Sequence, residues 1–498
     1  MLEYWFSGLQ TCFTPWHIFL LLLGSSLGIL SGAIPGISGT MALALAVPVS
    51  YTMGPTAALL LLISIYVASV YSGSISGILF RTPGAPEGVA ATLDGHAMAK
   101  QGKAGEALGL DIASSVIGGM IGAIALALIA PKLAEVALQF GAPEYFAISI
   151  LGLSVVSSFG TKNEVKAIAG ALIGLFVGCI GIDRISGFER FTFGTNALLN
   201  GVSFIPVIIG LFAVSEVVSR IVKKIEIEKV KSKTRAKLPS LKLLYRLKGL
   251  IARSGLIGTF IGILPGVGAT TAAFVSYSEA VRWSKNPEKY GTGAPEGVAA
   301  AEVANNAACS SAMVPLLTLG IPGSAGTAII LGAFLIHGMQ PGPLLFLKQP
   351  QLTYTIFVGM FIANLVIIFL AKIFINYFVK VIALPYTVLG PGIVICCIVG
   401  TFAIQNSFGD IWIMIAFAAI GFFLERFNYP LAPVILGVVL GPIAEENLRQ
   451  TMLISNNNPL ALIGTPLSAT LIVLAALSLF SPQIRLLWKK ISQSKNTK

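Results

Sequence analysis

The sequence predicts an all-α, polytopic membrane protein, and its composition and charge spacing support that prediction. Of its 498 residues, 55% are hydrophobic and 11% are charged, and the mean hydropathy is +0.86. A soluble globular chain of this length exposes more charge on its surface. No Asp, Glu, Lys or Arg lies between Glu3 and Arg81. One membrane-spanning helix needs roughly 20 apolar residues, so this first stretch alone is long enough for about three spans.

Seven further uncharged runs follow along the chain. They cover residues 112–131, 145–161, 191–215, 254–278, 303–347, 381–409 and 450–484. Because Gly and Pro interrupt several of these runs, we expect about 11 to 14 membrane segments, some of them broken half-helices.

The positive charge predicts the orientation of the chain. The formal net charge is +12, and twelve Lys or Arg residues lie in the segment 220–253, with more in the tail from Arg485 to Lys498. Cytoplasmic loops of membrane proteins are enriched in Lys and Arg. The first seventeen residues carry neither. We therefore expect a periplasmic N-terminus and a cytoplasmic C-terminus, and the basic charge needs no nucleic-acid partner.

An internal repeat divides the chain into two halves. GILSGAIPGISGT, which begins at Gly28, matches GTFIGILPGVGAT, which begins at Gly258, with five identical residues at a constant offset of 230. A looser echo relates residues 81–84 (RTPG) to residues 320–323 (GIPG). We predict a first transmembrane repeat at 1–219, a basic cytoplasmic linker at 220–253, a second repeat with further helices at 254–484, and a cytoplasmic tail at 485–498.

The surroundings of the two copies predict that the repeat is inverted. The first copy follows a segment without positive charge, whereas the second directly follows Arg246, Lys248 and Arg253. The copies should then begin on opposite sides of the membrane. Secondary transporters commonly use a two-fold inverted repeat, which opens one central site alternately to each side. Two halves that run parallel are the alternative.

Pro-Gly interruptions within the apolar runs predict a binding site. They break helices, and in a membrane such breaks persist only inside protein or beside water. The N-terminus of the helix that follows each break suits a carboxylate, because its backbone N–H groups lack intrahelical acceptors. The predicted substrate-binding residues are Pro35, Gly36, Ser38, Gly39, Thr40, Pro83, Gly84, Pro265, Gly266, Gly268, Pro322, Gly323, Ser324 and Thr327. For the earlier glycines of each copy, Gly28, Gly32, Gly258 and Gly262, we favour close helix packing instead.

A few polar residues in apolar surroundings predict a coupling-ion or polar site. They are Asp94, Glu302, Asn305 and Asn306, whose oxygens suit Na⁺ or a proton. Glu302 shares one helical face with the two asparagines. For Asp94 a solvated loop, shared with Lys100, Lys103 and Glu106, stays open as the alternative. Arg81 either binds a carboxylate or anchors the chain at the membrane surface.

The sequence disfavours cofactor and enzyme chemistry. Cys12, Cys179, Cys309, Cys396 and Cys397 show no C-x-x-C spacing and are expected to be small core residues, and three histidines are too few for a zinc or haem site. We predict no cofactor and no metal beyond a coupling ion. No phosphate loop for ATP and no arrangement of nucleophile and base is recognisable.

Several longer motifs resemble the large membrane subunit of tripartite tricarboxylate transporters, the TctA family. They are GAIPGISGTMALALAVP near residue 32, ATLDGHAMAKQGKAGEALG from Ala91, ARSGLIGTFIGILPGVGA from Ala252, GAPEGVAAAEVANNAACSSAMVPLLTLGIPGSAGTA from Gly293 and HGMQPGPLLF from His337. The resemblance implies an inner-membrane permease that works by symport with a small membrane subunit and a periplasmic solute-binding protein. The segment from Pro83 to Thr92 is one residue longer than the family pattern, and His96 replaces an expected tyrosine.

Together these observations predict ion-coupled secondary uptake of a tricarboxylate or another small organic carboxylate across the bacterial inner membrane. A stand-alone carboxylate symporter that needs no partner is the alternative. A membrane-embedded enzyme fits the sequence less well, because it would need a nucleophile with a base or a metal cluster. A membrane scaffold that transports nothing leaves the paired helix breaks unexplained.

Overall fold

The computed structural model describes residues 2–34, 37–81, 84–159, 164–183, 185–195, 198–223, 236–381 and 386–479. Almost all regular structure in these ranges is helical. Two short strands, β1 (Gly181–Ile182) and β2 (Glu189–Arg190), pair antiparallel. The predicted all-α class is confirmed. Seven helical segments of the described chain are long and apolar enough to span a membrane, and five shorter apolar helices accompany them. The predicted total of 11 to 14 spans stays a prediction.

In the first half of the chain, two helices precede the first break and a third begins directly after it. After α1 (Leu2–Cys12), the side chain of Thr14 caps α2 (Pro15–Ala33), and Ser38 caps α3 (Gly39–Ser50). Both caps accept a backbone N–H that would otherwise lack a partner. The following elements are α4 (Pro55–Ser72), α5 (Ile75–Phe80), η1 (Pro86–Gly88), α6 (Val89–Met98), η2 (Ala99–Lys103), α7 (Ala104–Ala137), α8 (Ala142–Phe159), α9 (Glu164–Gly178), α10 (Phe204–Ile208), η4 (Ile209–Val214) and α11 (Ser215–Lys223).

The second half opens on α12 (Leu241–Ile263), so residues 241–253 of the predicted linker are already helical. The remaining elements are α13 (Gly268–Arg282), η5 (Pro287–Lys289), α14 (Pro295–Ser311), α15 (Met313–Leu319), α16 (Ala325–Ile336), α17 (Pro343–Lys348), α18 (Pro350–Val381), α19 (Tyr386–Gln405), α20 (Phe408–Arg426), α21 (Leu431–Ile454) and η6 (Pro459–Ile463).

The helices α2 to α5 and α12 to α15 follow one another in the same order, with matching breaks. The last residue of each series has a left-handed backbone: Arg81 has φ 61° after α5, and Gly320 has φ 71° after α15. These caps occupy the first positions of the RTPG and GIPG echo. The first residue of the echo therefore has the same left-handed backbone in both halves, while the direction of each half across a membrane stays a prediction.

Two buried helices, α4 and α14, form the centre of the molecule. Every residue of α4 from Ala57 to Ser72 is buried, as is every residue of α14 from Gly297 to Ser311. The repeat glycines pack against these two helices. A Cβ at Gly28 of α2 would lie 2.5 Å from the carbonyl oxygen of Ile65, and one at Gly258 of α12 would collide with the carbonyl oxygen of Ala304. Close packing, which we favoured for these glycines, is what the structure shows.

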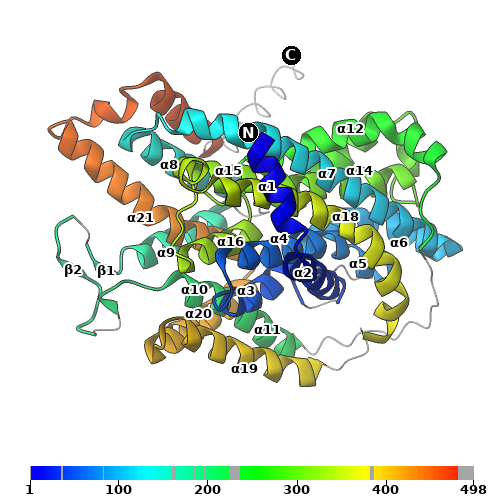
Figure 1. Ribbon diagram of the computed structural model, residues 1–498, viewed down its shortest axis with the longest axis horizontal. Coiled ribbons are helices and arrows are strands. Elements are labelled where there is room, and N and C mark those ends of the chain that lie inside the picture. The colour runs from blue at the N-terminus through cyan, green and yellow to red at the C-terminus, as the bar shows by residue number, and fades with distance from the viewer. Residues whose placement is uncertain are drawn as a thin grey trace, which may run out of the picture.

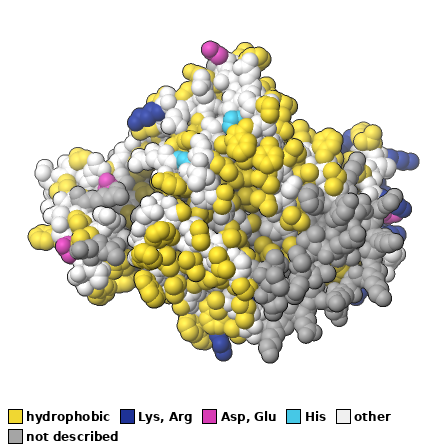
Figure 2. Space-filling view, turned by 60° about the horizontal axis from the view of Figure 1, so that its bottom comes forward, with side chains coloured by type: hydrophobic (Ala, Val, Ile, Leu, Met, Phe, Trp, Pro, Cys, Tyr) yellow, Lys and Arg dark blue, Asp and Glu magenta, His cyan; other side chains and the backbone are white. Residues whose placement is uncertain are grey.

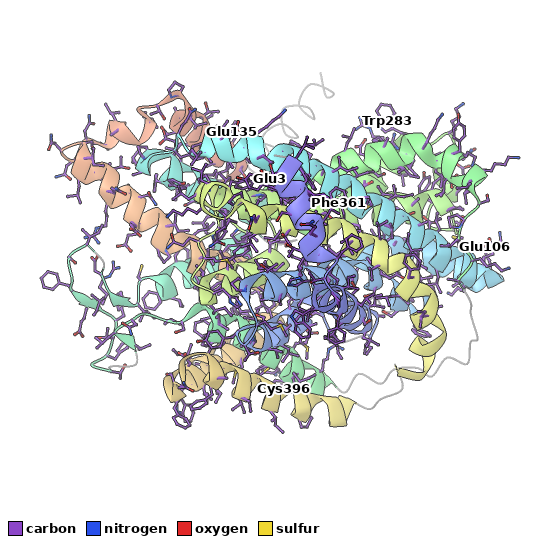
Figure 3. The ribbon with its side chains drawn as sticks, viewed as in Figure 1. Glu3, Glu106, Glu135, Trp283, Phe361 and Cys396 are labelled. Atoms are coloured by element: carbon purple, nitrogen blue, oxygen red, sulfur yellow. The ribbon has the colours of Figure 1, made fainter. Side chains whose placement is uncertain are left out.

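The other helices surround this centre. In Figure 1, α2, α3 and α4 lie near the middle, α12, α14 and α7 on one side, and α8, α9 and α21 on the other, while α19, α20 and α11 line one edge. Apolar side chains cover much of the face in Figure 2, and the Lys and Arg visible there lie toward its margins. Such an exposed apolar surface fits contact with lipid. Of the cysteines, Cys12, Cys309 and Cys397 are buried, whereas Cys396 lies exposed on the outer edge (Figure 3).

Candidate functional site

The residues that follow the first break begin α3. The hydroxyl of Ser38 accepts the N–H of Met41 at 3.1 Å and lies 3.0 Å from the hydroxyl of Thr40. Gly39 packs tightly on Ser69 of α4, where an added Cβ would collide with the serine hydroxyl. Ser38, Gly39 and Thr40 are half-buried. The first break therefore lies against the central helix α4. Pro35, Gly36 and Pro83 lie outside the described residues.

The two breaks of each half touch one another. In the first half, a side chain at Gly84 would collide with the carbonyl oxygen of Gly32, and the Gly84 N–H donates to the carbonyl of Gly73 at 2.9 Å. In the second half, the N–H of Gly266 donates to the carbonyl oxygen of Gly323 at 3.1 Å. Gly266 has φ +78°, which glycine adopts without strain. In each half, the two breaks are more than 50 residues apart in the sequence but lie in contact in the structure.

The remaining predicted residues of the second half lie at the starts of α13 and α16. Pro265 and Pro322 are buried, while Gly268 opens α13 with φ +77° and open space beside it. The N–H of Ser324 donates to the hydroxyl of Thr327 at 2.8 Å, and the N–H of Thr327 donates to the hydroxyl of Ser324 at 3.2 Å. This reciprocal capping fixes the first turn of α16.

Each central helix also holds the second break of the other half. The hydroxyl of Tyr66, on α4, shares a hydrogen bond of 2.8 Å with the hydroxyl of Ser324. On α14, the amide nitrogen of Asn305 donates to the carbonyl oxygen of Glu87 at 3.2 Å, in the turn that follows the first-half break. The paired breaks of both halves are therefore gathered around α4 and α14.

Asp94 lies in the interior rather than in a solvated loop. Its side chain is 0% exposed. Its Oδ1 accepts the N–H groups of Gly291, Gly293 and Ala294 at 2.7, 2.9 and 2.8 Å, and its Oδ2 accepts the hydroxyl of Tyr277 at 2.8 Å. The carboxylate thereby organises the loop that leads into α14. Lys100, Lys103 and Glu106 are solvent-exposed, as that interpretation expected, but they lie in the helices η2 and α7 rather than in a loop; Glu106 lies at the outer end of α7 (Figure 3).

Glu302, Asn305 and Asn306 form a buried cluster on α14. The Oε2 of Glu302 accepts the amide nitrogens of Asn305 and Asn306, each at 3.3 Å, and the hydroxyl of Ser115 on α7 at 3.0 Å. The three residues do share one helical face. Asp94, which we grouped with them by composition, has a different set of hydrogen-bond partners and lies with the loop before α14.

Sequence reasoning missed Asp111, which faces this cluster from α7. Its Oδ1 accepts the hydroxyl of Ser74 at 2.8 Å, and its carboxyl group lies close enough to that of Glu302 to interact with it electrostatically. A signal was present, since Asp111 is the acidic residue in the apolar stretch ALGLDIASS. An ionisable residue inside a membrane-spanning segment points to function.

Arg81 is exposed and caps α5, with its N–H donated to the carbonyl of Gly77 at 2.9 Å. Its two alternative roles, anion binding and membrane anchoring, stay predictions. The ring of His96, which departs from the family pattern, lies 3.1 Å from the carbonyl oxygen of Ile78. This histidine therefore joins α6 to α5.

Comparisons with known proteins extend over nearly the whole chain. A family model described as "Tripartite tricarboxylate transporter TctA family" matches residues 18–436. An "Uncharacterized 52.8 kDa protein in TAR-I ttuC' 3'region" of Agrobacterium vitis is 38% identical over 465 residues, 93% of each chain. An "Uncharacterized protein in TAR-II ttuC' 3'region" of the same organism is 42% identical over 215 residues, 43% of this chain and 89% of that protein. No solved structure matches.

Proposed function

Because the chain belongs to the TctA family of tripartite tricarboxylate transporters, we propose that it takes up a tricarboxylate or another small organic carboxylate across the bacterial inner membrane. Uptake is coupled to an ion and depends on a periplasmic binding protein and a small membrane subunit. The family membership and the apolar helices already identify a multi-pass membrane transport protein. The substrate, the coupling and the partners are what we propose here.

One observation carries the proposal: the helix breaks of both halves gather around α4 and α14. Tyr66 joins α4 to the second-half break at Ser324, and Asn305 joins α14 to the turn after the first-half break at Glu87. Broken helices within a membrane domain are favoured beside a polar cavity or buried in protein. Paired breaks at corresponding places in two repeats are typical of a transport site.

The starts of α3, α13 and α16 supply the chemistry for a carboxylate. Backbone N–H groups at a helix N-terminus lack intrahelical acceptors, and the helix dipole favours negative charge there. Gly39 and Gly268 open two of these helices and remain half-buried, as do Thr40 and Ser324. We assign the substrate to these residues together with Gly84, Gly266 and Gly323. Their small or hydroxyl side chains allow the ligand to approach the backbone.

The two halves are proposed to run in opposite directions across the membrane. Each half contains a central buried helix, two touching breaks and a left-handed cap in the same order. Two such halves can exchange conformations, so that one shared site opens alternately to the periplasm and to the cytoplasm. The basic segment 220–253 then lies in the cytoplasm.

Transport by the reconstituted protein tests this function. The binding protein is first screened against tricarboxylates, dicarboxylates and monocarboxylates, and the best ligand is then offered to proteoliposomes that hold the chain with its small subunit. We expect accumulation only when the binding protein is present. Accumulation by this chain alone would favour the stand-alone symporter, and no transport of any carboxylate by the full assembly would overturn the proposal.

A matched pair of glycine variants tests the assigned site. Gly266→Ala places a side chain where φ is +78°, a conformation that costs an alanine about 1 to 2 kcal/mol. Gly249→Ala adds the same methyl group in the helix α12, where nothing lies within 4 Å. We expect the first variant to lose uptake and the second to keep it. Equal uptake by both variants would remove the second-half break from the site.

A further inference from the structure

Two carboxyl groups meet between α7 and α14, one from each predicted half of the chain. Asp111 and Glu302 are both 0% exposed. The two helices are in close contact, since side chains at Gly118 and Gly122 of α7 would collide with carbonyl oxygens of α14. The carboxyl groups of Asp111 and Glu302 lie close enough to interact electrostatically. Two ionised carboxylates are both acceptors, so a hydrogen bond between them needs a proton on one of them.

Only one oxygen of each carboxyl group receives a donor from another side chain. Ser74 donates to Oδ1 of Asp111, while Ser115, Asn305 and Asn306 donate to Oε2 of Glu302. Oδ2 of Asp111 and Oε1 of Glu302 are buried without a donor among the described residues. Buried polar atoms are rarely left unpartnered. These two oxygens are therefore the places where a proton fits.

A third unpartnered group points to the same place. The hydroxyl of Tyr71, on α4, is fully buried and has no hydrogen-bond partner within the described chain. It is close enough to both Asp111 and Glu302 to interact with them electrostatically. A tyrosine hydroxyl can either donate or accept a hydrogen bond. The tyrosine thus offers these carboxyl groups a further partner from the central helix of the first half.

No positive side chain balances this pair through a hydrogen bond. Among the described residues, the side chains that donate to the two carboxyl groups are hydroxyls and amides, all neutral. Tyr71 and the carboxyl groups themselves are the titratable groups that face one another from α4, α7 and α14. Glu87 reaches the cluster through its backbone carbonyl, which accepts from Asn305. Two adjacent buried carboxylates cannot both ionise without a large cost.

We infer that Asp111 and Glu302 are the coupling site of this transporter, and that the pair takes up and releases one proton in each transport cycle. This inference rests on the proposed carrier function. Uptake turns one carboxylate and a proton into a carboxylic acid that bonds to the other carboxylate, and release reverses that step. A proton supplies the donor that Oδ2 of Asp111 and Oε1 of Glu302 lack within the described part of the chain.

The geometry also connects this site to the substrate site. The amide nitrogen of Asn305 donates both to Oε2 of Glu302 at 3.3 Å and to the carbonyl oxygen of Glu87 at 3.2 Å. Loss of the shared proton leaves two repelling carboxylates on α7 and α14 and strengthens the pull of Glu302 on Asn305. That change loosens the hold of α14 on the turn after the first-half break. Proton release and movement of the break are thereby coupled.

The test compares two readouts in proteoliposomes that hold the complete transporter. One is accumulation of labelled substrate driven by a pH difference, with a pH-sensitive dye inside and the membrane potential clamped. The other is exchange of labelled for unlabelled substrate, which needs no net proton movement. A difference of about one pH unit supports up to about tenfold accumulation for each coupled proton. We expect the wild-type protein to acidify the lumen as substrate enters.

Asp111→Asn and Glu302→Gln each replace one carboxyl group by a neutral amide, so each variant resembles the protonated state of the pair. We expect each to lose the pH-driven accumulation, down to the level of equilibration, while exchange continues. Glu106→Gln is the matched control, because it removes an exposed carboxylate from the first turn of the same helix α7, and it should change neither readout. Tyr71→Phe, which keeps the buried ring, should weaken accumulation more than exchange.

Several outcomes would overturn the proton site. They are accumulation driven by a Na⁺ gradient with no response of the dye, pH-driven accumulation that survives in Asp111→Asn, and equal loss of both readouts in folded variants. The wild-type dye measurement stands even where a variant fails to fold. Absence of wild-type exchange would instead overturn the carrier function, so the two failures are distinguishable.

Discussion

Two regions of this molecule bring acidic side chains together in opposite ways. At its periphery, Arg190 lies 2.6 Å from Glu445, and Arg449 lies 2.5 Å from Asp183, which joins the β1–β2 hairpin to α21. In the centre, Asp111 and Glu302 meet each other with neutral donors around them. The first arrangement pairs both carboxylates with a guanidinium and holds local structure together. The second leaves charge uncompensated, as a site that must gain and lose an ion requires.

Asp94 lies between these two extremes and shows that a buried carboxylate does not need a cation. Three backbone N–H groups and one phenol hydroxyl occupy its oxygens. Hydrogen bonds to an ionised group are stronger than those between neutral groups. In contrast, one oxygen of Asp111 and one of Glu302 lack a donor among the described residues. Asp94 and the proposed coupling pair, Asp111 and Glu302, are equally buried. They differ in the number of hydrogen-bond donors that surround their oxygens.

The largest expected effect comes from Asp94→Ala, which removes that acceptor altogether. Three N–H groups and the hydroxyl of Tyr277 would lose their partner, and each buried unsatisfied group costs about 1 to 3 kcal/mol. We expect the variant to aggregate or to melt far below the wild-type protein in detergent, as measured by fluorescence-detected size exclusion and thermal unfolding. Glu106→Ala, on the exposed start of α7, is the control. A normal melting temperature for Asp94→Ala would mean that the loop before α14 does not depend on this carboxylate.

A smaller effect is expected from Tyr66→Phe, which breaks a neutral contact between the halves. The change removes the hydrogen bond to Ser324 and keeps the ring. A typical hydrogen bond contributes about 1 kcal/mol, so uptake should fall by about fivefold. Tyr245→Phe removes a phenol hydroxyl from a residue that is 70% exposed and should leave uptake unchanged. If both variants transport equally, the link between α4 and α16 plays no part in the cycle.

Local sequence patterns predicted the parts of this centre that lie close together in the chain. Pro-Gly pairs marked the helix breaks because proline and glycine act on their own backbone. The spacing of Glu302, Asn305 and Asn306 placed them on one face because a helix repeats every 3.6 residues. These features need no knowledge of the tertiary fold.

Contacts between distant residues could not be predicted in this way. Asn305 and Glu87 are 218 positions apart, and the loop that surrounds Asp94 begins 197 residues after it. Neither pairing follows from composition or periodicity, since both depend on how the halves pack. The same reason explains why Asp111 escaped notice: its partner lies on another helix. The grouping of Asp94 with Glu302 relied on composition, and packing separates them.

The peripheral region gives a third prediction with a smaller effect. Arg449→Gln removes the partner of Asp183 and one of the two partners of Glu445. Partly exposed ion pairs contribute little to stability. We therefore expect a lower melting temperature than in the wild-type protein, a smaller decrease than in Asp94→Ala, and undiminished uptake. Arg282→Gln, which breaks an exposed pair with Glu279 within α13, is the matched control. Loss of uptake in Arg449→Gln alone would give the hairpin a role in transport.

The smallest expected effect is a pH dependence of the difference in melting temperature between the wild-type protein and Arg449→Gln. The Arg449 guanidinium, together with hydrogen bonds from Ile185 and Ser186, holds the pKa of Asp183 well below its usual range. A carboxyl group with a depressed folded-state pKa stabilises the fold above its unfolded pKa, about 3.9 for Asp, and loses that contribution as pH falls through the folded value. The gap in melting temperature between the wild-type protein and Arg449→Gln should therefore stay constant from about pH 7 to 5 and narrow below about pH 4. A gap that is unchanged at pH 3 would overturn this prediction, because it would show that Arg449 does not stabilise the fold through ion pairs with carboxylates.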